Sequence, residues 1–317
     1  MGRVLCVAQD KSYLVDKLPL ACQQEQAAFE FLEEQRWGDL PQCPRCESPD
    51  VFKMTDKATG GRSSRFLWHC RECNRQYTVR IGTVFEDSRI PLRHWVLGFW
   101  MVCSSKKGIS ALQVKRLTGL SYKSTLFMMH RIRKALHEPL EPQSLRGVVE
   151  IDETYVGGRE RGRLGRGTKK KVPVMAMVER GGRARPFPIT DVTAKTLKGA
   201  VRQYVHPSAT IMTDDFSSYR GLNREFEGGH QTVRHSRGEY VRGLAYTNTV
   251  ESFFALLKRG IYGTFHSVSR KHLHRYCSEF EFRHNNRDCD DGERTARAIR
   301  AAEGKRLTYK QQVGHEQ

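Results

Sequence analysis

The chain has 317 residues, 38% hydrophobic and 28% charged, as expected for a globular protein of two or three domains. No apolar run reaches the roughly 20 residues that span a bilayer, and the amino terminus lacks a signal-peptide pattern, so we expect a cytoplasmic protein without membrane association. Lysine and arginine number 54 against 35 acidic residues, a net charge of +19, which favours nucleic acid as the partner over a merely basic surface.

Pattern changes divide the chain into five expected parts. Residues 1–36 form an N-terminal helical segment, in which Ala28, Phe31 and Leu32 have helical spacing. The other parts are a cysteine-rich segment (37–82), a helical segment (83–140), an alternating strand and helix segment (146–290) and a polar, peripheral C-terminal tail (291–317).

Two cysteine pairs dominate the segment 37–82. "CPRC" supplies Cys43 and Cys46, and "CREC" supplies Cys70 and Cys73. Each tight turn presents two thiolates, so the spacing predicts a four-cysteine Zn²⁺ site that is structural, because no ligand position remains for water. Strand patterns around a Gly-Gly loop complete a zinc ribbon. The nine cysteines are an odd number without a secretion signal, which argues against a disulfide framework.

The segment 83–140 predicts a helix-turn-helix. Ser110 is expected to cap a helix that Gly119 ends, and Ser121 is expected to cap the next helix. Tyr122 and Lys123 would then begin the second helix, where recognition helices meet base edges. The alternative is an ordinary three-helix core that does not contact DNA.

The segment 146–290 has the chain order of an α/β ribonuclease-H-like domain. Its patterns give three strands, a helix, two further strands and a final helix, which form a mixed five-stranded sheet with helices. A long helical connection separates the first strand, "GVVEIDETYVGG", from the fourth, "ATIMTDDFSSY". These two strands can therefore lie side by side and parallel.

Carboxylates gather where these strands end. Parallel pairing would bring Asp152 near Asp214, although the adjacent Asp215 is an alternative, since strand alternation turns only one of the two toward Asp152. Glu150 shares the face of Asp152, and Glu153 points to the opposite face.

The helix "TNTVESFFALLKRGIYG" supplies a third carboxylate. Glu251 borders its apolar stripe, Lys258 lies about 20° from Glu251 and two turns along, and Asn248 is the expected N-cap. Three carboxylates from separate elements can hold two Mg²⁺ or Mn²⁺ ions about 4 Å apart for phosphoryl transfer. Alternatively, each acid is simply solvated at the end of its element.

Several stretches carry a resemblance to a known family, among them "EIDETYVGG", "TDDFSSY", "HSRGEYV" and "NTVESFFALLKRGIYGTFHSVSRKHLHRYCSEFEFRHNNR". From about Trp37 to Arg287 the chain resembles bacterial insertion-sequence transposases of the DDE type, in the zinc-ribbon-containing family related to the eukaryotic Merlin elements. By this resemblance Asp152, Asp214 and Glu251 match the catalytic, magnesium-binding carboxylates.

The resemblance implies a DNA transposase that nicks transposon ends and transfers the freed 3′ hydroxyl to target DNA. The ribbon and the helix-turn-helix would recognise terminal inverted repeats, and the protein would work as a homo-oligomer on paired ends in the cytoplasm, associated with the bacterial nucleoid. Lys258, with its neighbour Arg259, would hold a DNA phosphate. From its composition, the glycine-rich loop 157–171 would grip further phosphates through Arg159, Arg161, Arg163 and Arg166, the alternative being an ordinary solvated hairpin loop.

Two other functions fit part of this pattern. A domesticated transposase would bind DNA as a sequence-specific regulator without cutting it. A ribonuclease-H-like nuclease or resolvase would use the same metals without strand transfer.

Overall fold

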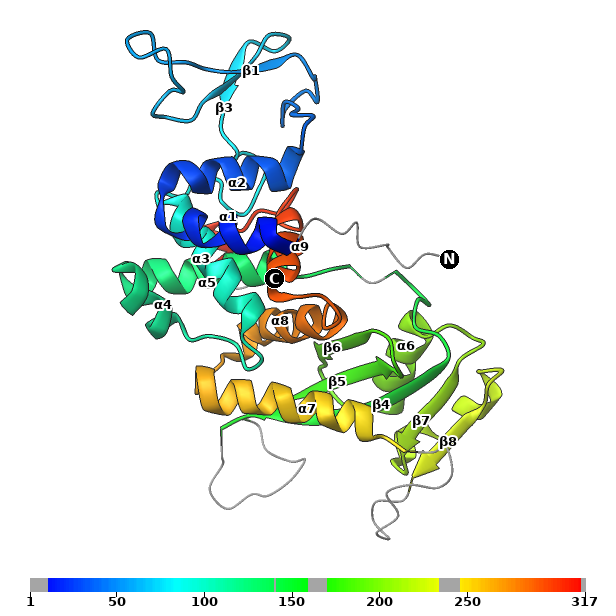
Figure 1. The fold of residues 1–317 in the computed structure, drawn as a ribbon. Coiled ribbons are helices and arrows are strands. Elements are labelled where there is room, and N and C mark those ends of the chain that lie inside the picture. Colours follow the sequence, from blue (N-terminus) through cyan, green and yellow to red (C-terminus); the bar gives the residue numbers. More distant parts are fainter. Residues whose placement is uncertain (1–10, 140, 159–169, 234–245, 315–317) are drawn as a thin grey trace. The chain divides into compact units, whose positions relative to one another are not determined.

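The computed structural model describes residues 11–139, 141–158, 170–233 and 246–314. The chain forms two compact units (Figure 1). The ribbon unit comprises the chain up to residue 105, residues 109–136 and the chain from residue 289 onward. The sheet unit comprises residues 106–108 and 137–288. No helix in the described part of the chain is long and apolar enough to span a bilayer.

The ribbon unit contains short strands and helices from both ends of the chain. Its elements are α1 (Lys11–Gln23), α2 (Glu25–Trp37), β1 (Val51–Lys53), β2 (Trp68–Cys70), β3 (Arg75–Tyr77), α3 (Leu92–Ser104), α4 (Ala111–Thr118), α5 (Tyr122–Ala135), α9 (Asp291–Arg300) and α10 (Tyr309–Val313). The three strands form an antiparallel sheet in the order β1-β2-β3, as expected for a ribbon.

The expected helix caps are present in the ribbon unit. The Ser110 side chain accepts a hydrogen bond from the Gln113 N–H at 3.2 Å, and Ser121 accepts one from Ser124 at 3.1 Å. Gly119 ends α4 with φ 71°, a left-handed conformation that favours glycine. The two expected helices, α4 and α5, are therefore present with the expected caps, and their DNA-binding role stays a prediction.

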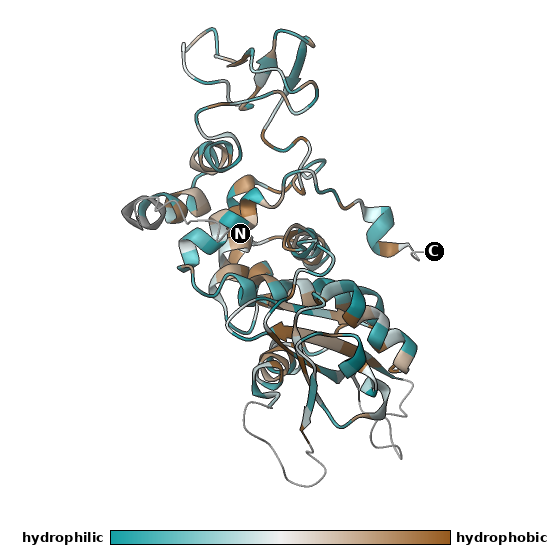
Figure 2. Ribbon diagram, turned by 90° about the vertical axis from the view of Figure 1, so that its right-hand side faces the viewer, coloured by the Kyte–Doolittle hydropathy of each residue, from teal (hydrophilic) through white to brown (hydrophobic). Residues whose placement is uncertain are grey.

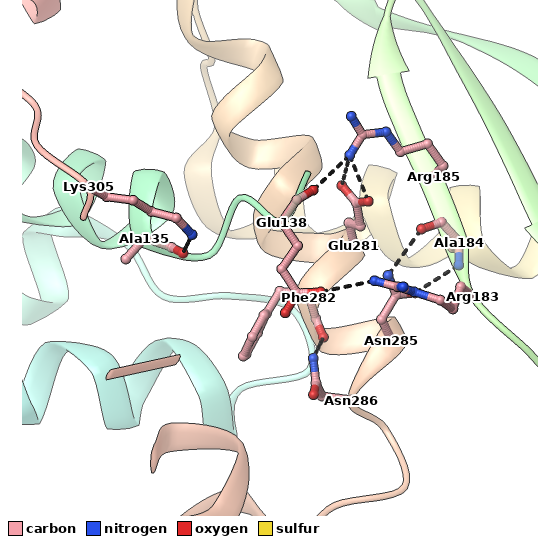
Figure 3. Close-up of polar contacts among 10 residues, drawn as sticks. All are labelled: Ala135, Glu138, Arg183, Ala184, Arg185, Glu281, Phe282, Asn285, Asn286 and Lys305. Carbon is pink, nitrogen blue, oxygen red and sulfur yellow. Dashed lines mark hydrogen bonds and ion pairs between the residues drawn. The ribbon is translucent and has the colours of Figure 1, made fainter. Parts of the chain in front are cut away.

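The C-terminal segment differs from the expected polar, peripheral tail. Helix α9 buries Ala296, Ala298 and Ile299 within the ribbon unit, and α3 lies beside it. Lys305 then donates a 2.6 Å hydrogen bond to the Ala135 carbonyl at the end of α5 (Figure 3). The expectation was wrong because the apolar face of α9 is short and made of small residues among charged ones.

The sheet unit is built on five strands in the order β6-β5-β4-β7-β8. Its elements are β4 (Val148–Gly157), β5 (Lys171–Glu179), β6 (Ala184–Pro188), α6 (Ala194–Tyr204), β7 (Thr210–Asp214), β8 (His230–Val233), α7 (Asn248–Gly260) and α8 (Leu273–Asn285), with a 3₁₀ turn at Ser217–Tyr219. Strands β4, β5 and β6 are antiparallel neighbours, and β4, β7 and β8 run parallel. This mixed sheet confirms the ribonuclease-H-like fold.

Both faces of the five-stranded sheet are covered by helices. Val149 and Ile151 of β4 pack with α6 on one face, whereas Val156 of β4 packs with α7 and α8 on the other. Figure 2 shows the apolar central strands of this unit between helices. The alternation of β4 side chains therefore decides which of its acids faces α7.

Helix α8 is joined to the edge strand β6 by polar contacts (Figure 3). The Asn285 amide accepts from the Ala184 N–H at 2.8 Å and donates to the Ala184 carbonyl at 3.3 Å. Arg185 donates to buried Glu281 at 3.0 Å and to the Glu138 carbonyl at 3.1 Å. The Asn285 amide thus satisfies both backbone groups of Ala184 on the edge strand, and Arg185 adds a buried ion pair to α8.

Candidate active site

The strand register brings Asp152 and Asp214 to the same level of the sheet. Parallel pairing places Val148 beside Thr210 and Glu150 beside Met212. The paired residues end at Glu150 and Met212, and the register continued by two residues sets Asp152 level with Asp214. Both side chains are half-buried.

The face of β7 distinguishes Asp214 from Asp215. Ile211 packs in the core on the α6 side, whereas Met212 packs with Val148 and Val233 on the other face. By alternation Asp214 lies on the face of Met212, which is also the face of Glu150 and Asp152. Asp215 follows the strand and is exposed.

Local backbone donors orient both aspartates. The Asp152 carboxylate accepts a hydrogen bond from the Glu153 N–H at 2.7 Å, and the Asp214 carboxylate accepts one from the Phe216 N–H at 3.0 Å. Each carboxylate is thus held by the chain that immediately follows it, which reduces the rotamer freedom lost when a ligand binds.

Tyr219 is a residue at this site that the sequence reasoning did not identify. It is completely buried in the core on the α6 side. Burial, followed by the charges of Glu153, Asp152 and Asp214, raises the pKa of its phenol well above the ordinary value. The signal available in the sequence was "TDDFSSY", in which the tyrosine follows the acidic strand end by one short turn.

Helix α7 carries Glu251 in its first turn. Val250, Phe253 and Leu257 are buried and Glu251 is exposed, so the predicted apolar stripe is confirmed. The Thr247 hydroxyl donates to the Glu251 carboxylate at 2.9 Å.

The prediction of an Asn248 cap was wrong. Asn248 is the first helical residue, and the Thr247 side chain before it caps no backbone N–H. Glu150 of β4 accepts the hydrogen bonds of the first helical turn instead, from the Thr249 N–H at 2.7 Å and the Val250 N–H at 3.1 Å. A carboxylate 99 residues away in sequence therefore replaces the local cap.

The expected DNA-binding residues occupy different parts of the chain. Lys258 and Arg259 are exposed in the last turn of α7. Tyr122 and Lys123 are exposed at the start of α5, where the Lys123 ammonium lies 4.9 Å from the ring centre of Tyr309. The loop residues Arg159, Arg161, Arg163 and Arg166 lie outside the described residues.

The four predicted cysteines converge on one point of the ribbon. The sulfurs of Cys43, Cys46, Cys70 and Cys73 all lie within 4.8 Å of one another. The Cys43–Cys73 and Cys46–Cys70 sulfur distances are 3.7 and 3.6 Å. These values are close to the roughly 3.8 Å edge of a tetrahedron with 2.3 Å zinc–sulfur bonds.

The electrostatics of Cys43 also favour metal binding. Burial raises the pKa of the Cys43 thiol, but the backbone N–H groups of Cys46 and Arg45, together with the side chains of Cys46 and Cys73, outweigh it and lower the pKa to about 7. Cys43 therefore offers the thiolate, the form that binds zinc, whereas the pKa values of Cys46 and Cys73 are raised. The cluster has the geometry and chemistry of a structural zinc site.

Comparison with known proteins matches two segments of the chain to known domains. Residues 144–285 match the ISXO2-like transposase domain, and residues 23–76 match the transposase zinc-ribbon domain. The chain is also 31% identical over 275 residues to an uncharacterized protein in the transposable element ISH50 of Halobacterium salinarum, an alignment that covers 82% of this chain and 90% of that protein. Taken with the ribbon and the mixed sheet, these matches show that the chain belongs to the ISXO2-like, IS1595 family of insertion-sequence transposases with an N-terminal zinc ribbon.

Proposed function

We propose that this transposase binds the terminal inverted repeats of an insertion sequence and catalyses metal-dependent cleavage and strand transfer of DNA. The observation that carries the proposal is the common level and common face of Asp152 and Asp214 on adjacent parallel strands. Glu251 enters from α7, which is tied to the same strand two residues before Asp152.

Asp152, Asp214 and Glu251 are the proposed ligands of two Mg²⁺ or Mn²⁺ ions. The fit is chemical, since these residues offer carboxylate oxygens, the ligands that hard cations prefer. When bound, such a metal pair activates an attacking oxygen and stabilises the leaving oxygen in an in-line displacement at phosphorus. In this proposal the β4 and β7 backbones would hold Asp152 and Asp214, and α7 would supply Glu251.

DNA is the proposed partner of this chain, whose net charge is +19. Lys258 lies on the same helix as Glu251, so a phosphate held there would stay near the reacting strand. The ribbon and the exposed residues Tyr122 and Lys123 of α5 are the proposed readers of the inverted repeats, with Arg259 and the loop arginines supplying further phosphate contacts. Two ends must be joined in one event, so we propose a homo-oligomer on paired ends.

The experiment is a joining assay with an end duplex taken from the inverted repeats that flank the gene, a target plasmid and Mg²⁺. We expect nicked ends and end–target joints, both lost without the divalent ion and with a scrambled duplex. Binding without nicking would indicate a regulator, and nicking without joints would indicate a nuclease or resolvase. Either outcome would overturn the proposal.

A further inference from the structure

Glu150 is a buried acid that the proposed chemistry does not use. It lies on β4, two residues before Asp152, and its side chain is completely buried. Its Oε1 accepts from Arg180 Nε at 2.6 Å and from the Thr249 hydroxyl at 2.9 Å. Its Oε2 accepts from the N–H groups of Thr249 and Val250. Four donors from two other segments thus converge on one carboxylate.

The contact places a negative charge at the N-terminus of α7. The first N–H groups of a helix have no partner within the helix, and the helix dipole favours an anion there. A buried carboxylate also needs a cation, and Arg180 supplies it across a 2.6 Å ion pair. The Glu150 carboxylate therefore accepts the free N–H groups at the start of α7, and its own charge is neutralised by Arg180.

Arg180 extends the same contact to the segment before α7. It donates to the Tyr246 carbonyl at 2.9 Å, and its guanidinium lies 3.5 Å from the centre of the Tyr246 ring. The chain is thereby held on both sides of the helix start, at Tyr246 and at Thr249.

The position of this contact links two proposed metal ligands. Glu150 and Asp152 are two residues apart on one strand face, about 6.6 Å along the strand. Glu251 directly follows Val250, whose N–H is bound to Glu150. The contact therefore lies close to both ligands. Asp152 is two residues from Glu150 along β4, and Glu251 is one residue from Val250 along α7.

We propose that Glu150 is a positioning residue that fixes the start of α7, and with it Glu251, relative to Asp152. The proposal rests on the proposed function for the identity of the ligands. Glu150 acts through the helix and not on the DNA. Replacement of groups that orient metal ligands typically lowers metal affinity about 10- to 100-fold.

The sheet unit offers a matched control for a purely structural role. Glu281 of α8 is also buried and also pairs with an arginine, Arg185, at 3.0 Å. It joins α8 to β6 and does not contact the start of α7. Glu281→Gln therefore disturbs a comparable ion pair without touching the proposed path from Glu150 to Glu251.

The experiment measures Mn²⁺ binding to the zinc-loaded full chain by electron paramagnetic resonance, and the Mn²⁺ concentration that half-saturates end joining. In Glu150→Gln the amide NH₂ must face either the helix N–H groups or Arg180. We expect both Mn²⁺ constants to rise at least about tenfold. Glu281→Gln should keep both constants within about twofold of the parent, even if its melting temperature falls.

Thr249→Val is the milder companion, since it removes one hydrogen bond to Glu150 and leaves the backbone donors. It should weaken Mn²⁺ binding severalfold, and it carries the test if Glu150→Gln does not fold. Parental Mn²⁺ constants in the folded variants, or an equal loss in Glu281→Gln, would overturn the proposal. If the parent binds Mn²⁺ but joins no DNA, the proposed function fails while the comparison of Mn²⁺ affinities still decides the role of Glu150.

Discussion

Asp214 and Asp215 are neighbours in sequence with different surroundings. Asp214 is half-buried at the end of β7 on the face of Asp152, and Asp215 is exposed beyond the strand. The sequence left the choice between them open, because strand phase depends on which apolar residues of β7 face α6. In the structure Ile211 and Met212 pack on opposite faces of the sheet, which determines the face on which each later residue of β7 lies.

Substitution of the two aspartates should therefore have unequal effects. We expect Asp214→Asn to lower the joining rate by about a hundredfold or more, since a metal ligand for the transition state is lost. Asp215→Asn should stay within a few fold of the parent. Joining rates under saturating end duplex would measure the difference, with gel-shift affinity as the control for DNA binding. Equal losses in the two variants would rule out the assignment of Asp214.

At the scale of elements, the ribbon depends on its metal. Its core is small, and the buried thiols of Cys43 and Cys70 form part of it. Small metal-bound modules gain much of their folding free energy from the ion.

Cys70→Ser should accordingly abolish zinc binding and unfold the ribbon. We expect about one zinc per parent chain by atomic absorption, and none in the variant, together with loss of specific end binding. Cys289→Ser is the matched control, because Cys289 lies outside the cluster, and it should retain the zinc. Zinc retained by Cys70→Ser would contradict the four-thiolate site.

Helix α8 contains a buried group, Glu281, and a half-buried group, His284, with opposite effects of pH on stability. Burial lowers the pKa of His284 to about 4, below the ordinary 6.5, so His284 makes the fold less stable as pH falls from 6.5 toward 4. Burial raises the pKa of Glu281 to about 7, above the ordinary 4.5, so Glu281 makes the fold less stable as pH rises from 4.5 through 7.

Single variants should separate these two dependences. For Glu281→Gln we expect the free energy of unfolding to rise more steeply with pH between 4 and 6.5 than in the parent, because the opposing contribution of Glu281 is gone and that of His284 remains. For His284→Gln we expect it to fall between pH 4.5 and 7. Urea unfolding across this pH range gives both slopes, and slopes of the same sign in the two variants would refute the pKa assignments.

At the scale of the whole molecule, the sequence predicted what short-range patterns encode. The zinc ligands follow from two CxxC turns, and the apolar stripe of α7 follows from helical spacing. Glu150 as the cap of α7 was not predictable, because its partners lie about a hundred residues away and a local candidate, Asn248, was present. Tyr219 was missed for a similar reason, since its approach to the acids depends on the turn after β7.

The basic charge of the whole chain predicts salt-sensitive binding. Lys258→Ala should weaken binding of end and scrambled duplexes alike, and it should reduce the slope of log affinity against log salt by about one. Fluorescence anisotropy at several salt concentrations measures the slope. An unchanged slope would show that Lys258 does not contact a phosphate.

The central claim, that carboxylates of β4, β7 and α7 hold metal ions on the scissile phosphate, is tested most directly by sulfur substitution. A non-bridging oxygen at the cleavage site of the end duplex is replaced by sulfur, and cleavage rates are compared in Mg²⁺ and Mn²⁺. We predict a loss of at least about tenfold in Mg²⁺ for one diastereomer, largely restored by the softer Mn²⁺. Equal rates for sulfur and oxygen in Mg²⁺, or a loss that Mn²⁺ does not relieve, would contradict the claim.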